Sequence, residues 1–162
     1  MEMKLLLVFL LIIPTFAICQ QKPEPFYQNE KFVSTAFGIK TTVHGFIKKY
    51  GNSFHVTKKP VSNEHNPRLT DTIYIFQKGN CKIEIYHSQS ADFVQSAMIT
   101  SPLIDIGSGI KIGQTKKEVI TRLKLKTTPN KFQVGDLESG SLYSFEFIQD
   151  TLNSVEFEGY VD

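Results

Sequence analysis

Apolar residues recur at helical spacing in two stretches of the chain. In the first stretch they stand at positions i, i+3, i+4 and i+7, as Val43, Phe46, Ile47 and Tyr50. This spacing puts all four on one side of a helix, so the pattern predicts a helix over residues 42–50 that buries that side. Thr41 or Thr42 can cap its beginning, and Gly51 can end it.

The second stretch, residues 109–123, begins with a short apolar strand and a glycine turn. Thr115 and Glu118 then stand three positions apart before an apolar run, which is the spacing of a capping box. In that arrangement the hydroxyl and the carboxylate each satisfy a free backbone N–H of the first turn. The apolar residues of the predicted helix are Val119, Ile120 and Leu123.

A shift of 73 positions aligns the two stretches. It pairs Thr42 with Thr115 and Phe46 with Val119, and it thereby preserves both the cap and the apolar spacing. We interpret the two stretches as an approximate internal repeat. The alternative is a pair of ordinary amphipathic helices.

Antiparallel strands are predicted after each helix. Alternating apolar and polar residues flank the turn Lys78-Gly79-Asn80, and a second hairpin surrounds Asp150-Thr151. The predicted strands cover residues 72–76, 81–86, 93–100, 103–106, 142–148 and 153–160. The polar segment 56–68 contains two prolines and is expected to be partly loop.

These elements predict an α+β fold in which two helix-plus-antiparallel-β-meander repeats form one curved sheet with helices on one face. We expect residues 1–19 to be a signal peptide and residues 20–30, which hold two prolines among polar residues, to be a flexible leader. Residues 31–109 then form the first repeat and residues 110–162 the second, within one compact domain.

Strand alternation predicts which side chains turn toward the helices and which turn away. The expected inward residues are Ile73, Ile75, Ile83, Ile85, Tyr143, Phe145, Phe147, Val155 and Phe157. The expected outward residues are Tyr74, Phe76, Glu84, Tyr86, Glu146, Glu156, Glu158 and Tyr160. Aromatic and acidic side chains on one exposed face are typical of protein recognition, so the outward set is the predicted partner-binding site. The alternative is that a loop or the leader covers these aromatics.

The N-terminus has the pattern of an export signal. Lys4 precedes an unbroken apolar run over residues 5–13, and Ala17-Ile18-Cys19 resembles a small-x-small cleavage site. The run is shorter than the ~20 residues that a membrane-spanning helix needs. We therefore expect an exported protein, periplasmic or secreted. The alternative is a membrane-anchored lipoprotein with a lipid anchor at Cys19.

Composition and charge narrow the possible partners and chemistry. The formal net charge is +2, too small to indicate a nucleic-acid or membrane-surface partner. Without Cys19 only Cys81 remains, so we expect no internal disulfide. Cys81 also opens an alternating strand, which is more typical of a small core residue than of a nucleophile.

Other motifs lead to no catalytic, cofactor or metal site. Gly109 and Gly113 enclose three residues where a phosphate loop needs four, and Gln114 stands where that loop needs lysine. The four histidines lack metal-ligand spacing. Glu156 and Glu158 are neighbours on one side of a strand and are more typical of a solvated face than of an acid–base pair. We therefore expect no enzyme activity and no cofactor.

The unit Ile112-Gly113-Gln114-Thr115 with Glu118-Val119 and Leu123, followed by a meander and present twice, resembles the β-lactamase-inhibitor-protein-like fold. The same unit occurs once in small outer-membrane assembly lipoproteins of the SmpA/OmlA family. The resemblance implies a curved sheet with helices on one face and a protein that binds other proteins. This chain lacks the paired cysteines of the tandem inhibitors, so the resemblance implies no inhibitor role.

The sequence thus predicts a non-catalytic binding module of the cell envelope that recognises a protein partner through the outer side of its sheet. Two other functions stay open at this point: an enzyme that acts on envelope material, and a purely structural envelope component.

Overall fold

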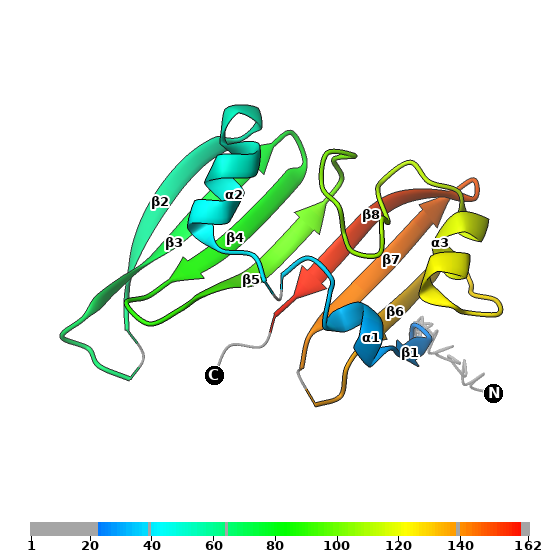
Figure 1. Ribbon diagram of the computed structural model, residues 1–162, viewed down its shortest axis with the longest axis horizontal. Coiled ribbons are helices and arrows are strands. Elements are labelled where there is room, and N and C mark those ends of the chain that lie inside the picture. The colour runs from blue at the N-terminus through cyan, green and yellow to red at the C-terminus, as the bar shows by residue number, and fades with distance from the viewer. Residues whose placement is uncertain (1–22, 39, 64, 139, 160–162) are drawn as a thin grey trace, which may run out of the picture.

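The structure, a computed structural model, describes residues 23–38, 40–63, 65–138 and 140–159. One mixed sheet of eight strands runs through this part of the chain, and three α-helices lie on one of its faces (Figure 1). The fold is therefore α+β, as the sequence predicts. The predicted signal peptide, Cys19 and Tyr160 lie outside the described residues.

The strands stand in the order β1-β6-β7-β8-β5-β4-β3-β2. Their bounds are β1 Phe26–Gln28, β2 His55–Ser62, β3 Thr70–Lys78, β4 Cys81–His87, β5 Asp92–Ile99, β6 Lys131–Gly135, β7 Leu142–Ile148 and β8 Thr151–Glu158. The helices are α1 Glu30–Val33, α2 Val43–Tyr50 and α3 Lys116–Leu123, with a 3-10 turn at Gly51–Ser53. β1 pairs in parallel with β6, and every other neighbouring pair is antiparallel.

Both predicted helix caps are confirmed. The Thr42 hydroxyl accepts a hydrogen bond from the Gly45 N–H at 3.1 Å, which fixes the beginning of α2. At α3 the Thr115 hydroxyl accepts from the Glu118 N–H at 3.3 Å, and the Glu118 carboxylate accepts from the Thr115 N–H at 2.8 Å. These bonds satisfy backbone donors that the first turn of a helix leaves free.

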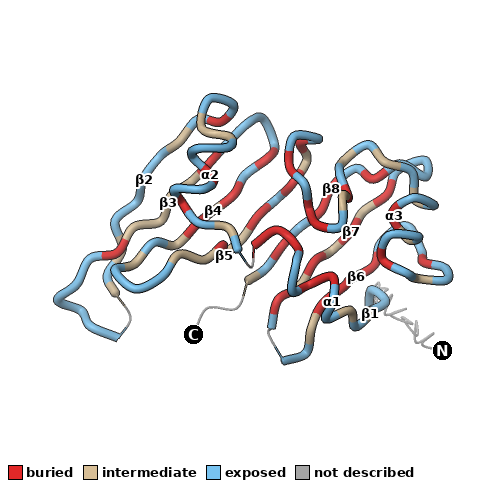
Figure 2. The backbone as a smooth tube through the Cα atoms, in the orientation of Figure 1, coloured by how far each residue is buried: buried red, intermediate tan, exposed pale blue. Residues whose placement is uncertain are grey.

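Apolar side chains fill the layer between the helices and the sheet. In the second half, the predicted inward residues of β7 and β8 are all buried. Phe132 of β6 stacks on Phe145 of β7 with 5.1 Å between ring centroids. In the first half, Phe46 of α2 packs on Phe76 of β3 with 4.5 Å between ring centroids. Figure 2 shows buried positions alternating with less buried ones along β4 and β7 and along most of β8.

The predicted flexible leader is wrong for its described C-terminal part. Residues 26–28 form β1 at the edge of the sheet, and α1 begins at Glu30. Phe32 of α1 packs edge-on against Tyr143 of β7, with 5.2 Å between ring centroids. β1 and α1 lie against the second meander, although they precede the first one in the sequence (Figure 1).

Two strands and one turn differ from the sequence prediction. Residues 55–62, expected partly as loop, form the edge strand β2, and β6 was not predicted at all. β2 carries Lys58, Lys59 and Pro60, residue types that protect sheet edges and that obscure the alternation. Residues 103–106 form a turn and not a strand.

Candidate binding surface

The face of the sheet opposite the helices, here called the outer face, holds five of the eight predicted site residues. These residues are Glu84, Tyr86, Glu146, Glu156 and Glu158. Their positions follow from strand register: Ser96 of β5 lies between Glu84 of β4 and Glu158 of β8, and Glu156 pairs with Met98. Residues that alternate with them, such as Ile83 and Phe157, are buried on the helix side.

The prediction for β3 is wrong. Phe76 is fully buried against α2, and Tyr74 lies on the same helix side, where its partners across the strands are Lys58 and Ile85. Ile73 and Ile75 point outward instead. β3 carries apolar residues on both sides, so alternation alone does not decide which side faces the core. The ring of Phe46 on α2 decides it, because this ring packs against Phe76.

The reversed β3 places an apolar group on the outer face that the sequence did not indicate. We call this group the outer apolar cluster: Ile73, Ile75, Tyr86 and Phe93. Tyr86 pairs with both Ile73 and Phe93, and its ring stacks on that of Phe93 at 4.8 Å between centroids. All four side chains are only half-buried. The α-helices lie on the other face (Figure 1).

A buried carboxylate holds Tyr86 in place. The Tyr86 hydroxyl donates a hydrogen bond to Asp71, and the Asn63 side-chain amide donates to the same carboxylate at 2.6 Å. Asp71 is only 4% exposed, so this pairing compensates much of the cost of removing its carboxylate from water. The ring of Tyr86 is therefore fixed before any partner arrives, which lowers the entropic cost of binding.

Ion pairs engage two of the four outer glutamates. Glu84 pairs with Lys82 at 2.6 Å and Glu146 pairs with Lys131 at 2.8 Å. These lysines, together with hydrogen bonds from Ser96 and Ser154, hold the pKa values of Glu84 and Glu146 below their ordinary range. Burial opposes this effect but does not outweigh it.

The carboxylates of Glu156 and Glu158 have no ion-pair or hydrogen-bond partner among the described residues, and both side chains are exposed. Beside Glu156 the outer face has a shallow hollow of about 90 Å³ whose lining includes Met98, Lys131 and Glu146. This part of the outer face therefore carries several carboxylates. It lies beside the outer apolar cluster, on the side of the sheet toward β7.

Within residues 23–38, 40–63, 65–138 and 140–159, no group of three or more His, Cys, Asp or Glu side chains is placed to hold a metal ion. None of the described helices has the length and apolar content needed to cross a membrane.

Comparisons of the chain with protein-family models, with curated proteins and with solved structures each find no match. The resemblance to the β-lactamase-inhibitor-protein-like fold therefore stays a prediction, and the function has to be argued from the geometry of this chain.

Proposed function

We propose that this protein is an exported, non-catalytic binding module whose outer face recognises a protein partner. The observation that supports the proposal is the outer apolar cluster, which is fixed in place, half-exposed and bordered by carboxylates. Rigid aromatic and aliphatic area at the centre of a surface supplies most of the energy in typical protein interfaces. A polar rim then adds orientation and specificity.

The charges of the outer face indicate the chemistry of the partner. Lys82 and Lys131 already pair with Glu84 and Glu146, whereas no lysine, arginine or histidine in the described chain lies within 4.0 Å of the carboxylates of Glu156 and Glu158. A partner with lysine or arginine next to an apolar patch complements this arrangement. Complementary charge of this kind steers association and excludes partners with acidic surfaces.

We also propose that the two halves are repeats, with a strand alignment that differs from the helix alignment. The 73-residue shift pairs β2, β3 and β4 with β6, β7 and β8. β4 and β8 run in the same direction. However, the order β2-β3-β4 and the order β6-β7-β8 proceed across the sheet in opposite directions. Superposing the two sets would therefore turn the sheet over and put the helices on opposite faces. Figure 1 shows the helices on one face. The topology does allow β3–β5 to superpose on β6–β8 by a rotation about the sheet normal.

Site-specific photo-cross-linking in the native cell tests the proposed binding face. Met98 on the outer face and Ile47 on α2 are matched positions, since they are apolar and 37% and 43% exposed. Each is replaced in turn by p-benzoylphenylalanine. We expect protein adducts from position 98 and few or none from position 47. Adducts from position 47 alone, or none from position 98, would overturn the proposal.

A charge reversal tests the partner chemistry. Glu156→Lys combined with Glu158→Lys should abolish the adducts from position 98, because it replaces two unpaired carboxylates with cations. Glu138→Lys makes the same kind of change in the loop between β6 and β7 and should leave the adducts intact. Equal adduct yields from these variants would rule out the basic partner.

A further inference from the structure

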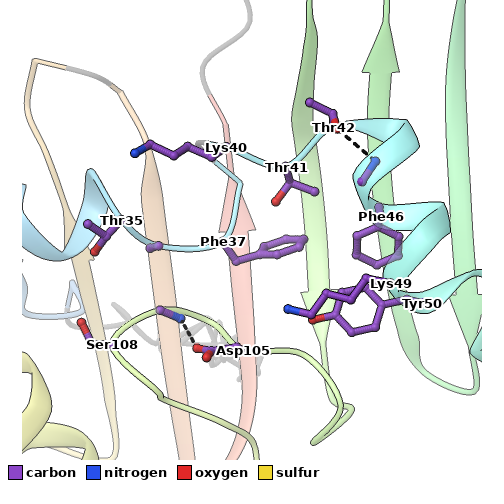
Figure 3. A pocket seen from close by; sticks show the side chains of 13 residues that line it. Thr35, Phe37, Lys40, Thr41, Thr42, Phe46, Lys49, Tyr50, Asp105 and Ser108 are labelled. Carbon is purple, nitrogen blue, oxygen red and sulfur yellow. Dashed lines mark hydrogen bonds between the residues drawn. The ribbon is translucent and has the colours of Figure 1, made fainter.

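A pocket of about 380 Å³ opens on the helix side of the molecule, away from the outer face. Three segments line it: the connector formed by residues 35–37 and 40–42, helix α2 directly after it, and the loop 105–108, which lies far away in the sequence (Figure 3). Its volume is within the range of small-molecule sites.

Backbone contacts hold the two loops of the pocket together. The Phe37 N–H donates a hydrogen bond to the Ile106 carbonyl at 2.8 Å. Gly107 has φ +129°, and a Cβ at this glycine would lie 2.7 Å from the Ala36 Cα, so the close approach requires glycine there. The connector and the loop are therefore held directly against each other at this side of the pocket.

Aromatic rings form the apolar part of the lining. Phe46 lies between Phe37 and Tyr50, with 6.3 Å and 4.7 Å between ring centroids. Phe37 and Phe46 are themselves buried. Tyr50 is only half-buried, so a flat apolar group that enters the pocket meets mainly this ring and the accessible part of Phe37.

Cations outnumber carboxylates in the polar part. Lys40 and Lys49 both line the pocket, and in the described chain neither has an ion-pair partner within 4.0 Å. The one carboxylate is Asp105, and one of its oxygens already accepts a hydrogen bond from the Gly107 N–H at 2.9 Å. Figure 3 shows Lys49 reaching from α2 toward the side of the pocket where Asp105 lies.

Hydroxyl groups add further donors. The Thr42 Oγ1 accepts a hydrogen bond from the Gly45 N–H at 3.1 Å, and the Thr41 Oγ1 accepts from the Gly38 N–H at 3.4 Å. Because both oxygens act as acceptors in these bonds, the O–H of each threonine is available to donate. The polar lining thus offers mainly donors and positive charge.

Lys49 is suited to binding and not to nucleophilic attack. Hydrogen bonding with Tyr50 raises the pKa of Lys49 above its ordinary value, and the nearby charge of Asp105 acts in the same direction, against a smaller lowering by burial. Its ammonium lies 5.0 Å from the centre of the Tyr50 ring, within the range of a cation–π contact. A lysine nucleophile needs the opposite shift.

We propose that this pocket binds a small organic anion, with its carboxylate at Lys49 and the Thr41 hydroxyl and with an aromatic or aliphatic body against Phe37 and Tyr50. This site is separate from the proposed protein-binding face.

Benzoate and benzamide are suitable probes because they have nearly the same shape and differ in charge. In amide NMR spectra of the 15N-labelled protein, benzoate should give saturable chemical-shift changes at Thr41, Gly45 and Gly107. The dissociation constant of benzoate should be at least roughly tenfold lower than that of benzamide, because benzoate makes a charge-assisted hydrogen bond. Equal affinity for the two probes, or shifts scattered over the surface, would overturn the proposal.

Two substitutions make the test specific. Lys49→Met should remove the preference for benzoate, whereas Lys48→Met, an exposed lysine of the same helix that does not line the pocket, should retain it. Asp105→Asn keeps an oxygen for the Gly107 N–H and removes the competing negative charge, so it should strengthen benzoate binding severalfold. Unchanged benzoate affinity in both Lys49→Met and Asp105→Asn would refute the site, and the gain expected from Asp105→Asn remains measurable if Lys49→Met does not fold.

Discussion

One residue, Asn29, joins the N-terminal segment to two elements of the second half. Its side-chain oxygen accepts a hydrogen bond from the Phe32 N–H at 3.0 Å and so caps α1. Its side-chain amide donates to the Leu123 carbonyl at the end of α3, at 2.9 Å. Its backbone N–H donates to the Gly135 carbonyl of β6 at 3.0 Å. A substitution here therefore tests how firmly β1 and α1 are held.

The expected cost follows from the two side-chain bonds. Loss of an N-cap costs about 1 kcal/mol. Loss of the donor to Leu123 leaves a partly buried carbonyl without that partner, at about 1 kcal/mol more. Asn29→Ala should therefore lower the free energy of unfolding by about 2 kcal/mol. Asn29→Ser keeps a capping oxygen and loses only the donor, so it should cost about half as much.

Urea denaturation followed by circular dichroism measures both variants, and native-state hydrogen exchange at the Phe32 N–H locates the effect. The reasoning is refuted if Asn29→Ala differs from wild type by less than about 0.3 kcal/mol, well below the usual cost of a lost cap. Equal costs for the alanine and serine variants would show that the cap contributes nothing and that only the bond to Leu123 matters.

Three further outcomes are expected. Thr115→Ala should lower the free energy of unfolding, measured by urea denaturation, by about 1 kcal/mol, whereas Thr115→Ser should change it little. An unchanged denaturation midpoint for Thr115→Ala would mean that the hydroxyl does not cap α3. Phe76→Ala should cost about 3–5 kcal/mol by opening a core cavity, and Ile75→Ala on the outer face about 1 kcal/mol, so similar costs would contradict the observed orientation of β3. Because Lys82 lowers the pKa of Glu84 in the folded state, this carboxylate contributes stability above its unfolded pKa, and that stability is lost as the pH falls. Below about pH 5 the free energy of unfolding should therefore fall more steeply with decreasing pH in wild type than in Glu84→Gln. Parallel pH profiles of the two proteins would exclude the ion pair as the cause.

The sequence predicted correctly those parts of the molecule whose structure depends on residues that are close together in the sequence. The capping box needs only Thr115 and Glu118, which are three positions apart, and the sequence located it correctly. The strands of the last hairpin alternate phenylalanine with polar residues, so their buried side was also predicted. All the large aromatic groups of these two strands stand on one side.

The sequence could not indicate features that depend on distant partners. β1 pairs with a strand more than a hundred positions later, from Phe26 to Gln133, and its own three residues carry no alternation. The orientation of β3 depends on a ring of α2. The pocket combines Lys40, Lys49 and Asp105 from three separate segments, and no spacing along the chain brings them together.

The position of β8 in the sheet has a consequence for unfinished or shortened chains. β8 lies between β7 and β5 and is the only described strand that links the two meanders. A chain that stops before residue 151 would leave β5 and β7 each with an unpaired backbone edge, and such edges invite aggregation. The exposed edges of β5 and β7 are therefore protected only after β8 has been synthesised. Incomplete chains are expected to aggregate and to be recognised by proteases and chaperones.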